Sequence, residues 1–99
     1  MRGRAGISPT QRIGGRLFIL RDSVWTDLRQ ADSLPVVTVA PFSQAYFALL
    51  RAIPELARPV GLTPAVLVAG GRVSVKIAAG GKETWRAGEL DALVRAFRS

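Results

Sequence analysis

Short β-forming runs dominate the first part of the chain. Runs at 12–13 and 16–21 flank Gly14-Gly15, and a glycine pair between two such runs predicts a two-residue β-hairpin. A second turn at Asp22-Ser23 leads into 24–28, where apolar and polar residues partly alternate. On a strand, this spacing places Trp25 and Asp27 together on one face. The pattern therefore predicts a three-strand meander.

The most regular strand pattern lies between residues 65 and 77. A run of apolar residues at 65–69 is followed by Gly70-Gly71 and by 72–77, in which small or polar and apolar residues alternate. This pattern predicts a hairpin, with Ser74 and Lys76 as the outward-facing residues of its second strand. A further short strand is predicted at 36–39, ending at Pro41.

Helical periodicity occurs twice. Ser43 is a candidate N-cap, and behind it an apolar stripe predicts a central helix near 43–57. Pro54 lacks an N–H, so this helix either ends near Ala52 and restarts as a short turn or kinks at the proline. A C-terminal helix is predicted near 88–98, with acidic residues at its start, basic residues at its end and one apolar face, formed by Leu90, Leu93, Val94 and Phe97.

These elements predict an α+β fold, with a small, mostly antiparallel sheet of about five to six short strands packed by both helices. The hairpins fall at the Gly-Gly pairs. A chain of 99 residues with 48% hydrophobic residues can build one modest core. We expect a mobile basic leader at 1–10 and a single α+β domain over 11–99.

Composition excludes several kinds of chemistry. The chain has no Cys and no His, which excludes disulfides, thiolate or imidazole metal ligands, and imidazole general bases. It lacks the phosphate-loop patterns GxGxxG and GxxxxGK[ST], and its carboxylates are dispersed. We therefore predict that the protein is not an enzyme, with no catalytic, cofactor-binding or metal-binding residue and no cofactor. No apolar run approaches the ~20 residues of a membrane span, and no apolar signal-peptide region follows the basic start.

Charge is the main indication of a partner. The net charge is +7, and the first 21 residues hold five arginines and no acidic residue. The candidate polyanion-binding residues are Arg12, Arg16, Arg21 and Arg29. A solvated basic surface without a specific partner is the competing interpretation.

Aromatic residues admit two interpretations. Phe18, Trp25, Tyr46 and Phe47 are candidates either for the core or for an interaction surface. If Phe18 and Trp25 lay on an exposed sheet face beside the arginines, they would form a stacking patch for single-stranded nucleic acid.

The segment 13–27, IGGRLFILRDSVWTD, and the segment 42–57, FSQAYFALLRAIPELA, carry a distinctive combination of residues. With the following hydrophobic hairpin, residues 13 to about 77 resemble the C-terminal region of bacterial proteins that carry a vault/inter-alpha-trypsin domain and a von Willebrand factor type A domain. Ser23 departs from the pattern, which usually has Gly there, and the final helix lies outside it. The type A domain itself is absent, so no metal or adhesion function is implied.

The resemblance implies a structural or interaction module of a larger envelope-associated protein, in which Trp25 and Tyr46-Phe47 pack sheet against helix. We expect a non-catalytic structural or protein-interaction module that binds a protein partner or self-associates through an uncovered strand edge. The alternative is a small basic nucleic-acid-binding protein that uses the N-terminal arm and the 16–29 hairpin. The compartment is left open, with the bacterial envelope expected if the chain is a fragment of an exported protein.

Overall fold

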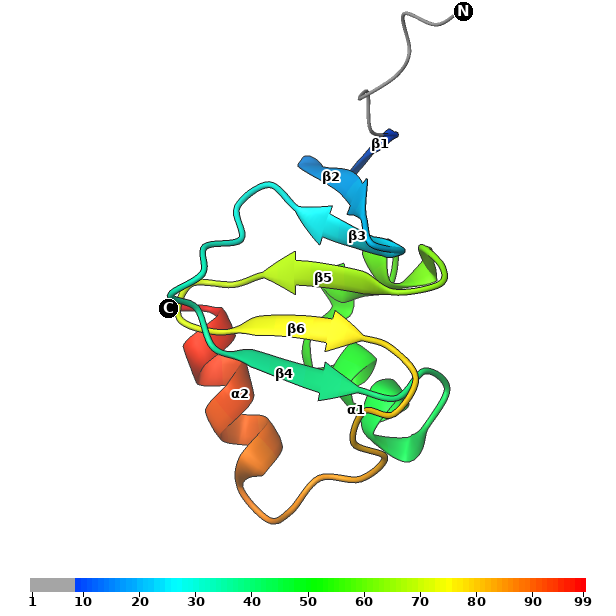
Figure 1. Ribbon diagram of the computed structural model, residues 1–99. Coiled ribbons are helices and arrows are strands. Elements are labelled where there is room, and N and C mark those ends of the chain that lie inside the picture. Colours follow the sequence, from blue (N-terminus) through cyan, green and yellow to red (C-terminus); the bar gives the residue numbers. More distant parts are fainter. Residues whose placement is uncertain (1–8) are drawn as a thin grey trace, which may run out of the picture.

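The computed structural model describes residues 9–99, which form an α+β fold with a six-stranded sheet (Figure 1). Residues 1–8, most of the predicted leader, lie outside the described residues. The strands are β1 (Thr10–Ile13), β2 (Arg16–Arg21), β3 (Val24–Asp27), β4 (Val36–Val39), β5 (Val66–Ala69) and β6 (Ser74–Ile77). The helices are α1 (Gln44–Ala52) and α2 (Glu89–Phe97), so the predicted fold class is confirmed.

The first three strands form the predicted antiparallel meander. The Gly14-Gly15 turn has positive φ at both positions, 60° and 82°, which glycine adopts without steric cost. The turn between β2 and β3 uses Asp22 and Ser23, also at positive φ. In β3, Trp25 faces Leu20 and Asp27 faces Phe18, so these four residues share one face of the meander as the alternation predicts.

The strand order is β1-β2-β3-β5-β6-β4, which the local patterns did not specify. The β5–β6 hairpin is antiparallel and matches the prediction, although the strands begin one or two residues later than expected. Two parallel contacts join the hairpin to the rest of the sheet: β3 pairs with β5, and β4 pairs with β6. In Figure 1, β1 therefore lies at one edge of the sheet and β4 at the other.

The central helix α1 begins at its Ser43 cap and ends before Pro54. Ser43 caps α1, since its side chain accepts a hydrogen bond from the Tyr46 N–H. The helix ends at Ala52 and the chain continues as short 3-10 helices at Pro54–Leu56 and Pro59–Gly61. This is the first of the two outcomes expected from Pro54.

Buried apolar side chains fill the space between the sheet and the helices. Phe18, Val66 and Val75 of the sheet are fully buried. They belong to one continuous cluster with Leu49 of α1 and Phe97 of α2. The predicted apolar face of α2 is confirmed, because Leu93 is buried and Leu90 and Val94 are half-buried against the same cluster. Both helices lie on this one face of the sheet, and within residues 9–99 the opposite face carries no helix.

Candidate interaction surfaces

The two edges of the sheet differ in how their main chain is covered. At the β4 edge, the Lys82 N–H donates to the Thr38 carbonyl and the Ala40 N–H donates to the Lys82 carbonyl, both at 2.9 Å. These two hydrogen bonds form an isolated parallel bridge between Val39 and Lys82, which pairs the C-terminal half of β4. Such cover blocks the addition of another strand at that end of the edge.

The β1 edge has no such cover within residues 9–99. Ile13 faces Arg16 across the hairpin, and Leu20 donates to the Pro9 carbonyl at 3.1 Å. Antiparallel pairs alternate between residues that exchange hydrogen bonds and residues that do not, so the N–H and C=O groups of Thr10 and Arg12 point to the free edge. The first three residues of β1 are exposed.

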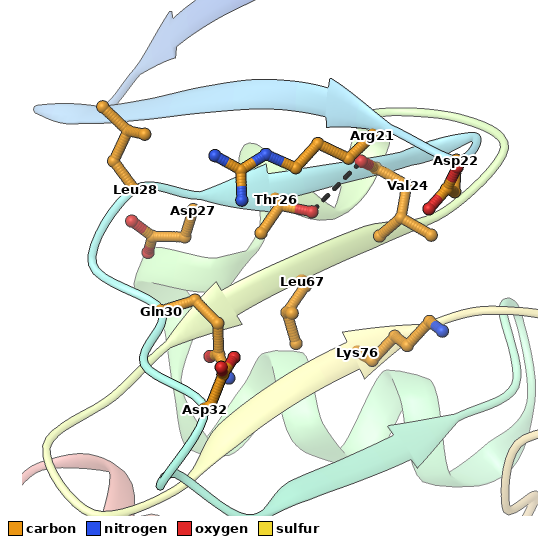
Figure 2. A pocket seen from close by; sticks show the side chains of 10 residues that line it. All are labelled: Arg21, Asp22, Val24, Thr26, Asp27, Leu28, Gln30, Asp32, Leu67 and Lys76. Atoms are coloured by element: carbon orange, nitrogen blue, oxygen red, sulfur yellow. Dashed lines mark hydrogen bonds between the residues drawn. The ribbon is translucent and has the colours of Figure 1, made fainter.

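A hollow of about 560 Å³ lies on the face of the sheet that carries no helix (Figure 2). Figure 2 shows Gln30 and Asp32 together at one end of it and Lys76 at the other. Both signs of charge line it, and its walls are formed by Arg21, Asp22, Val24, Thr26, Asp27, Leu28, Gln30, Asp32, Leu67 and Lys76. This mixture selects no single class of ligand.

Ser74 corrects one prediction made from strand alternation. It does face away from the helices, as expected, but it is fully buried. The loop after β3 covers it, because its hydroxyl donates to Gln30 Oε1 and its N–H donates to the Pro35 carbonyl at 2.9 Å. Lys76, two residues later, is only half-buried.

Asp27 joins three segments at one buried carboxylate, a role that its sequence neighbourhood did not reveal. Its Oδ2 accepts from Arg16 Nη1 at 2.5 Å and from the Ala69 N–H at 3.0 Å, and its Oδ1 accepts from the Arg29 N–H at 2.9 Å. Arg16 Nη1 also donates to the Ala69 carbonyl at 2.7 Å, and its guanidinium lies over the Phe97 ring. A buried carboxylate is stable only with partners of this kind.

The four predicted polyanion-binding arginines are divided between two sides of the sheet. Arg12 lies directly opposite Leu17 in the hairpin. Leu17 precedes the core residue Phe18 and therefore points away from the helices, as does Arg12. Arg21 is on the same side and lines the hollow of Figure 2. Arg16 and Arg29 lie on the other side, where Arg58 joins them around a second hollow. Arg58 was not among the predicted residues, because it is distant in sequence from the basic N-terminal segment.

The candidate aromatics are also divided. Phe18 is fully buried and Tyr46 nearly so, and a buried ring cannot stack on a base. Trp25 is half-buried on the helix-bearing side and donates from Nε1 to the Thr63 carbonyl at 2.9 Å, so the proposed Phe18–Trp25 stacking patch does not form. Phe47 is 48% exposed, so this ring does not pack sheet against helix as the resemblance implied.

Phe42 is an aromatic residue that the sequence patterns did not single out. It is 75% exposed and its φ is 62°, a left-handed conformation that bulky residues rarely adopt. Its ring centroid lies 5.3 Å from that of Tyr46, whose ring in turn lies 5.1 Å from Phe47. Phe42 and Phe47 are the exposed rings of this group and pack on the nearly buried Tyr46; we call the three residues the aromatic patch.

Two glutamates have perturbed acidities. The N–H of Arg86 and then the Lys82 ammonium hold the pKa of Glu89 below its usual value near 4.5. The pKa of Glu55 is lowered chiefly by its own main-chain N–H and then by Arg98. Within residues 9–99, acidic side chains do not gather in a group that could hold a metal ion, and no helix there is long and apolar enough to cross a membrane.

Comparison of the chain with protein-family models, curated proteins and solved structures finds no match.

Proposed function

We propose that this protein is a non-catalytic protein-interaction module that associates with a second copy of itself by adding β1 to β1. The observation that carries the proposal is the open edge of β1, where the outward N–H and C=O groups of Thr10 and Arg12 have no main-chain partner within residues 9–99. Such a strand edge is a template for further pairing.

The geometry favours one arrangement of the two strands. In an antiparallel pair centred on Gln11, Thr10 of each copy lies opposite Arg12 of the other. The two Arg12 side chains then do not face each other directly. Four main-chain hydrogen bonds contribute roughly 2–6 kcal/mol before the cost of association is subtracted, so the dimer is weak and depends on concentration.

The aromatic patch supports an interaction role independently of the edge. A bulky residue held exposed at positive φ is costly for the fold, and such outliers concentrate at functional positions. Aromatic residues, phenylalanine among them, are also enriched at the centres of protein interfaces. The resemblance of residues 13–77 to envelope-associated proteins agrees with a module that is part of, or derived from, a larger protein of that kind.

Blocking the edge tests the proposal. Proline at an outward-facing position removes an edge N–H and leaves the bonds to β2 in place, so Thr10→Pro/Arg12→Pro should be monomeric with an unchanged circular dichroism spectrum. The matched control, Thr10→Ala/Arg12→Ala, keeps both N–H groups and should associate like the natural chain. Sedimentation equilibrium measures all three proteins. A natural chain that is still monomeric at about 1 mM, where an association of ~4 kcal/mol is half complete, contradicts the proposal.

Nucleic-acid binding is the second candidate, and one observation favours it. Arg12 and Arg21 are both exposed and lie on the side of the sheet without helices. Chromatography with light scattering at low salt and at ~0.5 M salt, with the 260/280 nm absorbance ratio recorded, tests this candidate. Nucleic acid that copurifies and is removed by salt supports it, whereas a clean protein at both salts argues against it.

A further inference from the structure

A second hollow, of about 280 Å³, lies on the helix-bearing side of the sheet. The Gly14-Gly15 turn forms one wall and the loop after β3 supplies Arg29. The first 3-10 segment after α1 supplies Glu55, and Arg58 comes directly before the second one. Three stretches of chain that are far apart in sequence thus place basic groups around one small space, which we call the arginine hollow.

The charges around the arginine hollow do not cancel. Arg16 is paired with the buried Asp27, and Glu55 is paired with Arg98. Neither Arg29 nor Arg58 makes an ion pair with any residue of 9–99. Two positive charges are therefore left without a partner at this site.

Glu55 is the one acidic residue that lines the arginine hollow, and its carboxylate is held by Arg98. Both oxygens accept from the Arg98 guanidinium, at 2.8 and 3.0 Å. A bidentate pair of this kind is directional, so it fixes the carboxylate toward α2. The remaining donors at the hollow are guanidinium groups and the main chain of a glycine turn.

Asp27 connects the walls of the arginine hollow to each other. It binds the side chain of Arg16 and the main chain of Arg29 through its two oxygens. The β1–β2 hairpin and the loop after β3 are therefore held together before any ligand arrives. The main-chain positions of Arg16 and Arg29 are thus fixed in advance, and ordering on binding is confined to the side chains that contact the ligand.

We propose that the arginine hollow binds a tetrahedral oxyanion, the chemistry shared by free inorganic phosphate and by a phosphomonoester group. Guanidinium groups present paired N–H donors that match the oxygen spacing of a phosphate, and each such bond is charge-assisted. Arg29 and Arg58 are the residues that contact the ligand, whereas the charge of Arg16 is balanced by Asp27. The site is on the other side of the sheet from Arg12 and Arg21. Ile13 of β1 lines it, but the edge residues Thr10 and Arg12 do not, so the proposal stands independently of self-association.

The test is a titration of the ¹⁵N-labelled full chain with sodium phosphate at constant ionic strength. Saturable shifts are expected at the amides of Gly14, Gly15, Arg29 and Arg58. The same labelled chain is titrated separately with O-phosphoserine, as a phosphomonoester, and with sodium acetate, as an anion that is not tetrahedral. Shifts with phosphate and O-phosphoserine alike identify a site for phosphomonoester groups, and shifts with phosphate alone identify a site for the free ion.

Variants decide whether the named arginines are responsible. Arg29→Gln and Arg58→Gln should each weaken phosphate binding about tenfold or more, which is the effect of one charge-assisted hydrogen bond. Arg51→Gln removes an exposed arginine of α1 that does not line the arginine hollow, and it should leave binding unchanged. Glu55→Gln removes the only negative charge of the lining and should tighten binding.

The proposal is overturned if the shifts do not saturate, if acetate produces the same shifts as phosphate, or if Arg51→Gln weakens binding as much as Arg58→Gln. Arg58 is exposed and makes no side-chain hydrogen bond to residues 9–99, so Arg58→Gln is expected to fold. The dispersion of its amide spectrum without phosphate verifies the fold directly.

Discussion

Replacing Asp27 with alanine should destabilise the protein more than replacing any other carboxylate of residues 9–99. Asp27 is 1% exposed and is the only acidic residue among them that is buried. Its removal leaves the N–H of the buried Ala69 without a partner and leaves the Arg16 guanidinium with only the Ala69 carbonyl. The N–H of Arg29 belongs to an exposed residue and can bind water instead.

The magnitude follows from those partners. Removing one member of a buried ion pair costs about 3–5 kcal/mol, and an unsatisfied buried N–H accounts for roughly 1–3 kcal/mol of that. The Arg16 side chain is 19% exposed, so partial hydration keeps the cost toward the lower end. A domain of this size has a total stability of about 5–15 kcal/mol, so a loss of ~3 kcal/mol lowers Tm by more than about 12 °C.

Urea unfolding, followed by the fluorescence of Trp25 and Trp85, measures the loss. Asp32→Ala is the matched control, because Asp32 is an exposed carboxylate of the next loop and its loss should change stability by less than about 0.5 kcal/mol. In an Arg16→Ala background, Asp27→Ala should cost at least ~1 kcal/mol less than in the natural chain. Equal costs for Asp27→Ala and Asp32→Ala, or additive effects in the double variant, would refute the reasoning.

Three further predictions concern a close backbone contact, the aromatic patch and acid stability. Gly81→Ala should lower the free energy of unfolding by about 1–3 kcal/mol in a urea titration, because a Cβ there would lie 2.6 Å from the main chain of β4. Gly61→Ala is the control and should be nearly neutral, because a Cβ at Gly61 meets open space. Phe42→Gly should change stability by less than ~1 kcal/mol, since relief of the positive φ offsets the lost ring contact; a larger loss would make Phe42 a core residue rather than a contact residue. The pKa of Glu89 is lowered, mainly by the Arg86 N–H. The ionised Glu89 therefore stabilises the fold above pH 4.5, and this contribution is lost as the pH falls through the folded-state pKa. Glu89→Gln should reduce the drop in the urea midpoint between pH 7 and about pH 3.5.

Residue types and spacing alone predicted the individual elements of this fold. The Gly14-Gly15 turn, the Ser43 cap and the break at Pro54 each depend on interactions within a few residues, as does the β5–β6 connection at 70–73, which begins with the second glycine pair. The apolar face of α2 depends only on helical spacing. Such short-range rules also favour a single core, because each helix has one apolar face to bury and the sheet supplies a surface for both.

The candidate sites were less accessible from the sequence. Strand alternation correctly places Trp25 and Asp27 on one face of a strand, but it does not show that Asp27 is buried, because its partners Arg16 and Ala69 come from other strands. The sequence suggests one basic group of Arg12, Arg16, Arg21 and Arg29, but strand alternation and the loop after β3 place them on two sides of the sheet. Arg58 is more than thirty residues further along the chain than Arg21, so no local pattern connects it to them.

The sequence by itself therefore determined the elements, their turns and caps, the fold class and the absence of Cys and His chemistry. Only the tertiary structure decided the strand order, the open edge at β1 and the meeting of Arg29 with Arg58. The physical reason is range. Turns and helix caps are stabilised by contacts between near neighbours, whereas strand order and the walls of a hollow depend on which apolar faces of distant segments can be buried together.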